Sequence, residues 1–473
     1  MTATPVAPLD LSQPRALHVV GVGGPGMSAI AIALAEMGHD VTGSDIRERP
    51  VLERVRAAGV RVHIGHSREL VHGRDAITWS TAIPERNIER DEATRSGVPS
   101  LHRSGMLASI CALVKSLAVA GTHGKTTTTS MLMLILAEAG VRPSFVIGGD
   151  VTDMGTGAQW TGGEWLVVEA DESDGTHLTL PLFGTILTNV EVDHLDFYGT
   201  EEAIVEGFDQ YLAQISGPKV VCIDDPGAAQ LAARHDVITY GTSPTADFAA
   251  VDIAPAGGAF EFGVRHRGEL LGVVSLPLRG VHNVRNATGA IALAVSIGVP
   301  FAAASAALAK FGGVARRFDI RGVDDGATLV DDYGHLPSEI AAVLAAARNS
   351  GDAWQRVVAV FQPNRFNRIA AMWQDYAHAF VDADLVVLTE IYASGTEPIP
   401  GVTGKLLVNA VLDARPTTHM VWMPKRGDLV EFLARELRPG DVCISMGCGD
   451  VAALPDEVQT RRSELRADRQ RST

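Results

Sequence analysis

Short apolar runs rich in β-branched residues alternate along most of the chain with alanine-rich stretches of helical character. The first unit predicts a strand over 16–20, a glycine-rich turn over 21–28, a helix over 29–39 and a second strand over 40–45. Strands that alternate with helices in this way are typical of parallel sheets with helical crossovers. The pattern therefore predicts an α/β fold.

The alternation restarts twice, first at the strand predicted over 116–120 and again after the segment 310–322, whose glycines and arginines are typical of a linker. A chain of 473 residues is long for one core, and about 150 residues per domain predicts roughly three domains. We therefore expect domains over 1–114, 115–314 and 315–473.

Composition narrows the class of protein. With 46% hydrophobic and 20% charged residues the chain is typical of a globular protein, and a net charge of −16 argues against a broad nucleic-acid or anionic-membrane surface. Four cysteines without a CxxC pair favour free thiols. We expect neither a signal sequence nor a membrane span, because the N-terminus has no basic region followed by an apolar core and no window holds about 18 uninterrupted apolar residues. We expect a cytoplasmic protein that binds neither nucleic acid nor membrane. Roughly the first 14 residues and the polar tail from 461 onward are expected to be mobile.

The turn GVGGPGMS matches GxGxxG at Gly21, Gly23 and Gly26. Between a strand and a helix, such a turn presents backbone N–H groups to a pyrophosphate. Asp45, at the end of the next strand, occupies the place of an acid that reads a ribose or a base. The motif alone leaves open which diphosphate binds, with a dinucleotide cofactor or an empty turn as alternatives.

A second loop, GTHGKTTTTS, follows the strand at 116–120 and precedes the helix predicted over 130–140. Lys125 can reach outer phosphates, and the Thr126 hydroxyl is placed for Mg²⁺. The four threonines are expected to cap the start of the helix. A capped helix start with a chance lysine is the alternative.

Acidic residues follow two further predicted strands. Carboxylates at strand ends beside a phosphate loop are natural Mg²⁺ ligands, because that ion prefers oxygen. The first cluster contains Glu169, Asp171, Glu172 and Asp174, and the second surrounds His194 with Asp193 and Asp196. His194 could ligate a second metal ion or hold a structural hydrogen bond.

In the last third, polar side chains again follow strands. Asp331 could bind ribose hydroxyls, and guanidinium groups could clamp a carboxylate, although surface salt bridges are the alternative for these arginines. The polar residues of this part are Arg316, Arg317, Asp331, Tyr333, His335, Arg365 and Arg368. For the turn MGCGD at 446–450, the sequence does not indicate a ligand.

In the order in which they occur, these blocks resemble the Mur ligases over roughly residues 17–450. The blocks that carry the resemblance are GVGGPGMS, GTHGKTTTTSM, EADESD, TNVEVDHLDFYG, HNVRNA, GVARRFD, DDYGH, QPNRFNR and EIYASGTEPIPG. The resemblance implies a Rossmann-like N-terminal domain that holds a UDP-sugar rather than a dinucleotide. It further implies a central ATP-binding domain with a mostly parallel sheet and a C-terminal Rossmann-like domain.

The activity implied is that of an ATP-dependent ligase, most closely the family's alanine-adding branch. ATP would phosphorylate the lactyl carboxylate of UDP-N-acetylmuramate, and L-alanine would attack the acyl phosphate, a step of peptidoglycan precursor synthesis. The implied cofactor is Mg²⁺, as two ions for which Mn²⁺ can substitute. We expect a monomer or weak homodimer.

The resemblance also assigns roles to residues. Catalysis is assigned to Lys125, Glu169, His194 and His335, and metal binding to Thr126, Glu169 and His194. ATP is assigned to Gly121, Thr122, His123, Gly124, Lys125, Thr126, Thr127, His282, Asn283, Arg316, Arg317 and Asp331. The UDP-sugar is assigned to Gly21, Gly23, Gly24, Gly26, Met27, Ser28, Asp45 and Arg103, and the amino acid to Tyr333, His335, Arg365 and Arg368.

Two positions depart from the family's usual sequence. Leu336 and Asn364 each stand where the family usually has a histidine, and both lie at the amino-acid end. The identity of the amino acid is therefore open. Alternatives are a family member that attaches a recycled peptide or another amino acid, a non-catalytic nucleotide-sugar-binding paralogue, and a nicotinamide-dependent oxidoreductase that would leave the ATP loop unexplained.

Overall fold

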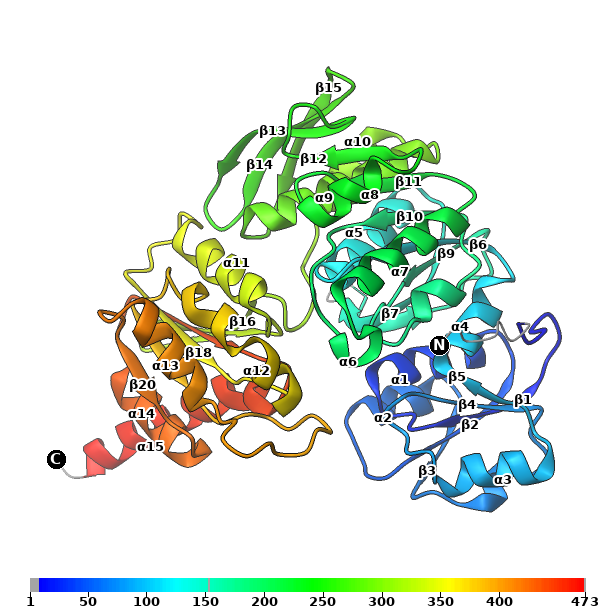
Figure 1. Cartoon of the computed structure of the whole chain (residues 1–473), viewed down its shortest axis with the longest axis horizontal. Helices are drawn as coiled ribbons and strands as arrows, with labels where there is room; N and C mark the ends of the chain where they lie inside the picture. Colours follow the sequence, from blue (N-terminus) through cyan, green and yellow to red (C-terminus); the bar gives the residue numbers. More distant parts are fainter. Residues whose placement is uncertain (1–7, 152–153, 472–473) are drawn as a thin grey trace. The chain divides into compact units, whose positions relative to one another are not determined.

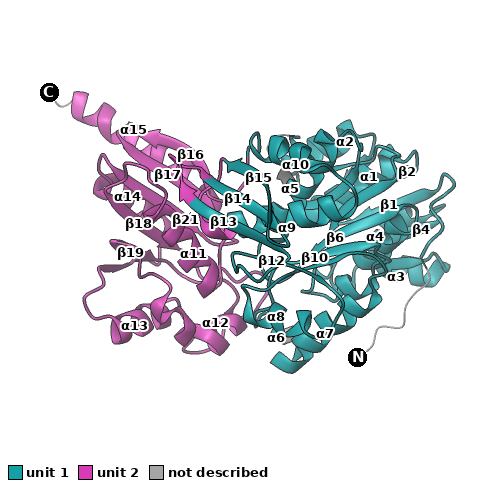
Figure 2. Ribbon diagram, turned by 90° about the horizontal axis from the view of Figure 1, so that it is seen from above, with its two compact units in different colours: residues 1–253, 261–276, 283–312 teal, residues 254–260, 277–282, 313–473 magenta. Residues whose placement is uncertain are grey.

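The computed structural model describes residues 8–151 and 154–471. Its internal contacts divide the chain into two compact units, which Figure 2 shows in teal and magenta. Unit 1 comprises the described residues up to 253, together with 261–276 and 283–312, and unit 2 comprises 254–260, 277–282 and the residues from 313 onward. The three domain ranges stay predictions.

Unit 1 begins with a sheet of five parallel strands in the order β3-β2-β1-β4-β5. The order reverses at β1, so the turn that follows β1 lies at the topological switch point where α/β sheets bind ligands. The strands are β1 (Ala16–Val20), β2 (Asp40–Asp45), β3 (Arg61–Ile64), β4 (Ala76–Trp79) and β5 (Ser100–His102). The helices are α1 (Pro25–Glu36), α2 (Val51–Ala57), η1 (Arg68–Val71), α3 (Ile88–Ser96) and α4 (Arg103–Cys111).

The second sheet has ten strands in the order β15-β14-β13-β12-β11-β10-β6-β9-β7-β8, with parallel pairing from β7 through β9, β6, β10, β11 and β12 to β13 (Figure 1). Its strands are β6 (Lys115–Ala120), β7 (Ser144–Val151), β8 (Thr156–Gln159), β9 (Trp165–Glu169), β10 (Gly184–Leu187), β11 (Lys219–Cys222), β12 (Ile238–Gly241), β13 (Phe248–Pro255), β14 (Phe260–His266) and β15 (Glu269–Leu276). Its helices are α5 (Lys125–Glu138), η2 (Thr176–Thr179), α6 (Leu195–Tyr198), α7 (Glu201–Gln214), α8 (Pro226–Ala232), α9 (Val281–Ser296) and α10 (Phe301–Leu308). β6 therefore pairs with β9 and β10, so the loops after these three strands meet at one edge.

Unit 2 contains a six-stranded sheet in the order β16-β17-β21-β18-β19-β20, antiparallel only between β16 and β17. The strands are β16 (Asp319–Asp324), β17 (Ala327–Asp332), β18 (Arg356–Phe361), β19 (Leu385–Leu388), β20 (Met420–Trp422) and β21 (Asp441–Met446). The helices are α11 (Pro337–Arg348), α12 (Phe366–Met372), η3 (Trp373–His378), α13 (Lys405–Ala414), α14 (Arg426–Glu436), η4 (Asp450–Ala453) and α15 (Leu454–Arg471). The continuous apolar run of β19 is buried, as expected for a strand covered on both faces. The α/β class and the mostly parallel central sheet are confirmed.

The polar tail is not the mobile segment predicted from its composition, because residues up to 471 form the end of α15. Leu454, Val458 and Arg462 recur at a spacing of four residues and are buried. The Arg462 guanidinium donates to Asp324 and to the carbonyl of Leu437. Arg462 thus belongs to the buried face of α15, although its charge alone predicts a solvent-exposed position.

The expected mobility of the N-terminus is also wrong for its described part. Leu11 is buried in the core of unit 1, and the Leu9 amide donates to the Ser109 hydroxyl at 2.8 Å. Residues 1–7 lie outside the described part of the chain. Across residues 8–151 and 154–471 we find no helix with the length and apolar composition that a membrane span requires.

Candidate active site

The second glycine loop runs from the end of β6 to the start of α5, as predicted. Gly121 has a φ of +125°, and a side chain there would meet the Thr188 hydroxyl and the backbone of Asn189. Gly124 has a φ of +79°, and its Cβ would lie 2.9 Å from Asn286 Oδ1. The His123 amide donates to Asn189 Oδ1 at 2.7 Å. Both glycines are therefore required by backbone conformation and by close neighbours.

Lys125 extends back across this loop. Its Nζ donates to the carbonyls of Gly121 at 2.7 Å and Thr122 at 3.2 Å, and it lies 2.7 Å from Glu172 Oε2. Burial opposes the charged form of Lys125, but the surrounding carboxylates, first that of Glu172, outweigh burial and raise the lysine pKa. Burial raises the pKa of Glu172 to about 7, against the effect of the Lys125 cation. Lys125 is thus a charged group already paired with a buried carboxylate.

Thr126 and Glu169 come together beside Lys125, as the metal prediction requires. The Thr126 hydroxyl donates to Glu169 Oε2 at 3.1 Å, and the Gly148 amide donates to Glu169 Oε1 at 2.8 Å. Burial raises the pKa of Glu169, against the effects of the Gly148 amide and Lys125. A half-buried carboxylate beside a hydroxyl is an oxygen donor set that fits a hard divalent cation such as Mg²⁺.

Contrary to the expectation from sequence, the threonines do not cap the start of α5. Gly124 occupies the N-cap position without a side-chain hydrogen bond, and the run from Lys125 onward is already helical. The Thr129 hydroxyl donates to the carbonyl of Lys125, and the Ser130 hydroxyl donates to that of Thr126, each at 2.8 Å. These bonds run four residues back along the helix, which leaves the amides at its start available to an anion.

His194 follows β10 at the start of α6. Its Nε2 lies 3.1 Å from Asp193 Oδ2 and 3.8 Å from Glu172 Oε1, so the histidine and the lysine of the loop share one carboxylate neighbour. Its backbone has a φ of 54°, and two other predicted site residues, Arg316 and Arg365, have φ values of 64° and 60°. A left-handed conformation costs a non-glycine residue of order 1–3 kcal/mol and is typical of functional sites.

The first glycine turn lies between β1 and α1, as predicted. The Gly23 amide donates to Asp45 Oδ2 at 2.9 Å, and the Gly24 amide donates to the Gly21 carbonyl at 3.0 Å. Asp45 is 4% exposed, so it fastens the turn from within. Met27 and Ser28 are also buried, where they belong to the first turn of α1.

Arg103 connects this turn to the acidic segment after β9. Its Nε lies 2.7 Å from Asp174 Oδ2 and its guanidinium 2.6 Å from Asp171 Oδ2. A Cβ on Gly26 would lie 3.6 Å from the same guanidinium. Burial favours the neutral form of Asp171, but Lys125 and Arg103 outweigh it and hold the pKa of Asp171 well below its usual range.

In unit 2, Asp331 is fully buried at the end of β17. Arg316 Nε lies 3.1 Å from Asp331 Oδ2, and another nitrogen of Arg316 donates to the Gly447 carbonyl at 2.7 Å. Within the described chain, Asp331 Oδ1 is buried and has no hydrogen-bond partner. The MGCGD turn, which sequence left without a role, thus contacts a predicted ATP ligand.

Tyr333 packs under both linker arginines, with the Arg316 and Arg317 guanidinium carbons 5.0 and 5.3 Å from its ring centre. The His335 amide donates to Glu339 Oε2 at 2.8 Å, and the rings of Tyr333 and His335 meet edge to face. The structure thus brings two predicted ATP residues and two predicted amino-acid residues into contact. The next residue, Leu336, is 2% exposed at the start of α11 and therefore presents no side chain at the surface.

Arg365 and Arg368 lie at the start of α12. The Arg365 amide donates to the Tyr392 carbonyl at 2.9 Å. Arg368 is 9% exposed, and its guanidinium donates to Asn364 Oδ1 at 2.9 Å. Asn364, which stands where the family usually has a histidine, therefore orients one of the two predicted carboxylate-binding arginines.

The remaining predicted ATP residues divide between the units. His123 and Thr127 lie in unit 1, where His123 Nε2 is 3.2 Å from Glu191 Oε2 and Thr127 is buried in α5. Asn283 belongs to unit 1 and accepts from Asn286 Nδ2 at 3.4 Å, whereas His282 belongs to unit 2. The predicted site thus consists of one set of residues in each unit.

Comparison of the sequence and fold with known proteins identifies the family of this chain. Three family models match in succession: "Mur ligase family, catalytic domain" over residues 16–115, "Mur ligase middle domain" over 119–294, and "Mur ligase, glutamate ligase domain" over 316–449. The UDP-N-acetylmuramate–L-alanine ligase of Geobacter sp. (strain M21) is 42% identical over 449 residues, which are 94% of this chain and 97% of the relative. The chain belongs to the Mur ligase family.

Two further Mur ligases support this assignment. The UDP-N-acetylmuramate–L-alanine ligase of Anaeromyxobacter sp. (strain Fw109-5) is 41% identical over 452 residues, covering 94% of this chain and 98% of the relative. The crystal structure of the UDP-N-acetylmuramate-alanine ligase from Thermotoga maritima is 27% identical, with a TM-score of 0.81 and coverage of 95% of this chain and 100% of that one. The predicted family resemblance is confirmed.

Three polar residues of this Mur ligase received no role from the family resemblance, although they contact residues that did. Glu172 pairs with Lys125, Asn189 holds the His123 amide, and Asn286 lies against Gly124. Each stands within a motif that the sequence had already set apart: EADESD, TNVEVDHLDFYG and HNVRNA. The motifs therefore carried the signal, but only packing selects these members.

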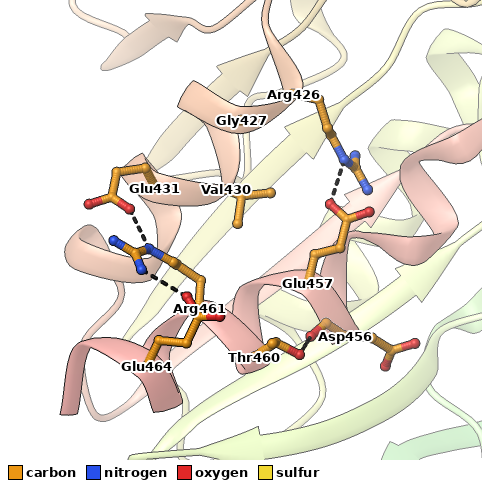
Figure 3. Close-up of a pocket in the computed structure, with 9 residues that line it drawn as sticks. All are labelled: Arg426, Gly427, Val430, Glu431, Asp456, Glu457, Thr460, Arg461 and Glu464. Carbon is orange, nitrogen blue, oxygen red and sulfur yellow. Dashed lines mark hydrogen bonds and ion pairs between the residues drawn. The ribbon is translucent and has the colours of Figure 1, made fainter. Parts of the chain in front are cut away.

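A groove of about 520 Å³ lies in unit 2 between α14 and α15 and contains none of the predicted site residues of this Mur ligase. Figure 3 shows that its arginines pair with its acids: Arg426 with Glu457, and Arg461 with both Glu431 and Glu464. These ion pairs offset the charges of Arg426 and Arg461, and Asp456 pairs with Arg321 outside the groove.

Proposed function

We propose that this Mur ligase joins L-alanine to the lactyl carboxylate of UDP-N-acetylmuramate at the expense of ATP. The observation that carries the proposal is the constellation after β6 and β9. There a loop lysine, a helix start with available amides and a hydroxyl–carboxylate pair lie together. The relatives that cover nearly the whole chain carry the same activity in their names.

The reaction has two stages. In the first, a lactyl carboxylate oxygen bonds to the γ-phosphorus of ATP while the bond to the β,γ-bridging oxygen breaks, which gives an acyl phosphate and ADP. In the second, the amine of L-alanine attacks the acyl carbon, phosphate leaves and the nitrogen loses a proton. Both stages concentrate negative charge on phosphoryl oxygens, so positioned cations lower the barrier.

Unit 1 supplies these cations and donors. Lys125 would bind the outer phosphates, and the amides at the start of α5 would bind phosphate oxygens. Thr126 and Glu169 would hold one Mg²⁺ and His194 a second, and these ions, for which Mn²⁺ can substitute, would offset the charge of the triphosphate. The ATP-facing set would be Gly121, Thr122, His123, Gly124, Lys125, Thr126, Thr127, His282, Asn283, Arg316, Arg317 and Asp331.

The nucleotide sugar is assigned to the N-terminal sheet of unit 1. The turn after β1 would bind its diphosphate, and Arg103 would contribute a guanidinium beside that turn. The set proposed is Gly21, Gly23, Gly24, Gly26, Met27, Ser28, Asp45 and Arg103. Asp45 would act mainly by holding the turn, because it is buried against the Gly23 amide.

The amino acid is assigned to unit 2. Arg365 and Arg368 would bind its carboxylate, and Tyr333 and His335 would border the amine, where His335 would assist catalysis. Leu336 is buried and Asn364 already bonds Arg368, so neither replaces the missing histidine as a direct ligand. We further propose that the protein acts in the cytoplasm, where ATP is supplied, and that it is a monomer or weak homodimer.

The test is phosphate release from ATP with purified protein, measured with and without UDP-N-acetylmuramate and with L-alanine, glycine, L-serine or a tripeptide as acceptor. We expect release only when the sugar nucleotide and an amino acid are both present, with L-alanine preferred. No stimulation by any acceptor would contradict a ligase. Preference for the tripeptide would assign the protein to peptide recycling instead.

A further inference from the structure

Lys125 has no N–H left over for a phosphate. An ammonium group carries three N–H donors. In this structure Nζ meets three groups: the Gly121 carbonyl at 2.7 Å, the Thr122 carbonyl at 3.2 Å and the Glu172 carboxylate at 2.7 and 3.0 Å. A phosphate oxygen can therefore bind Lys125 only if one of these partners is given up.

Glu172 is the partner that a phosphate would displace. The two carbonyls belong to the loop that would surround the phosphate, whereas the carboxylate is an anion that competes for the same cation. The side chains of Lys125 and Glu172 are 15% and 5% exposed, so water screens the pair weakly. Displacement would leave a buried carboxylate without its cation, which costs free energy unless another group replaces it.

The position of Glu172 is fixed from its backbone. Its carbonyl accepts from the Tyr198 hydroxyl at 3.0 Å and from the Gly175 amide at 3.1 Å. Asp171 and Asp174, on either side in the same turn, hold Arg103. His194 Nε2 lies 3.8 Å from Glu172 Oε1, within reach of a small side-chain movement. The turn therefore stays in place while the carboxylate can change partner.

We propose that Glu172 is a positioning residue that latches Lys125 across the loop after β6 and releases it when ATP binds. The latch rests on the proposed role of Lys125 in binding the outer phosphates. It means that part of the intrinsic affinity for ATP is used to break the Lys125–Glu172 pair. Weakening that pair should therefore tighten ATP binding.

The test measures the dissociation constant of Mg²⁺ with β,γ-imido ATP by titration calorimetry, without sugar nucleotide or amino acid. We expect Glu172→Gln to bind the analogue about tenfold more tightly than the parent, and Glu172→Asp about threefold. Glu172→Asp keeps the charge but withdraws it from Lys125 by one methylene. In a Lys125→Met background, Glu172→Asp should give no gain.

Asp174→Asn is the matched control, because it removes a carboxylate from the same turn that faces Arg103 instead of Lys125. Its affinity for the analogue should stay within about twofold of the parent. Thermal unfolding checks that each variant folds. If Glu172→Gln does not fold, the Glu172→Asp pair of measurements decides alone.

Other outcomes overturn the latch. A gain from Glu172→Gln with none from Glu172→Asp would show simple repulsion between carboxylate and triphosphate. An equal gain from Glu172→Asp with and without Lys125, or weaker binding in either variant, would show that Glu172 does not act through Lys125. Absence of analogue binding in the folded parent would instead refute the proposed ATP site, and the latch with it.

Discussion

Unit 1 contains two glycine turns that each join a strand to a helix, and they handle charge differently. The turn after β1 is fastened by Asp45, which accepts from a backbone amide of the turn itself. The loop after β6 carries Lys125, whose cation is paired with Glu172, and Thr126, whose hydroxyl meets Glu169. The first turn is therefore held by an acid, whereas the second carries a lysine cation, the kind of group that stabilises a transferred phosphoryl group.

The difference also shows why a glycine pattern alone says little about function. Both turns satisfy the geometric need for backbone N–H groups at a helix start. Only the second brings a lysine and carboxylates from neighbouring strands to the same point. Chemistry therefore depends on what the adjacent strands deliver to the turn.

The largest expected effect separates the two turns by function. Lys125→Ala should lower ligase turnover by about 10³-fold, because it removes the cation that stabilises the transferred phosphoryl group. UDP-N-acetylmuramate should still bind to the first turn, as calorimetry would measure. Loss of turnover together with loss of sugar-nucleotide binding would contradict the assignment of two sites.

Acidic pH should lower the stability of unit 1 through a buried histidine near the second loop. His177 follows the acidic turn, is fully buried and has no hydrogen-bond partner for its ring nitrogens among the described residues. Burial lowers the pKa of His177 from 6.5 to about 4. Because the folded pKa is depressed, stability is fully present above pH 6.5 and is lost as the pH falls towards 4, by up to about 3 kcal/mol.

The comparison needed is between the parent and His177→Phe, by urea denaturation at intervals between pH 7 and pH 4. The parent should lose stability relative to the variant over that range, since phenylalanine cannot be protonated. A difference between the two proteins that does not change with pH would contradict a buried neutral histidine.

Substitution of Gly121 in the second loop should have a larger effect than substitution of Gly24 in the first turn. Gly121→Ala places a Cβ at a φ of +125° and 2.9 Å from the Asn189 carbonyl, which should cost about 2 kcal/mol of stability and weaken ATP binding. Gly24→Ala is the mild change used for comparison in the first turn, because Gly24 has a φ of −73° and its Cβ would make an ordinary 3.4 Å contact. Thermal unfolding and nucleotide titration of both variants would test this, and equal losses would remove the distinction.

The smallest effect is expected at Asp45. Asp45→Asn keeps one acceptor near the Gly23 amide but removes the charge. The hydrogen bond that holds the turn should therefore contribute about 1 kcal/mol less to stability. Sugar-nucleotide affinity should fall several-fold while ATP affinity stays at the parent value. A change in ATP affinity without a change in sugar-nucleotide affinity would contradict the assignment of Asp45 to the sugar-nucleotide site.

Local patterns predicted the main elements well because their information lies in short segments. The strand before each glycine turn, the helix after it and the proximity of Thr126 to Glu169 follow from parallel strands ending at one edge of a sheet. The tail was predicted wrongly, because Arg462 is a charged residue in a buried helical position. Composition cannot reveal that Asp324, 138 residues away, supplies its partner.

The sequence by itself determined the α/β class, the two glycine turns, the motifs and the family to which they belong. The three-dimensional packing was needed to show which carboxylate of EADESD pairs with Lys125 and which hold Arg103. The reason is that neighbouring residues in a turn point in different directions. Their partners lie in the segments after β5, β6 and β10, and sequence spacing does not specify those distances.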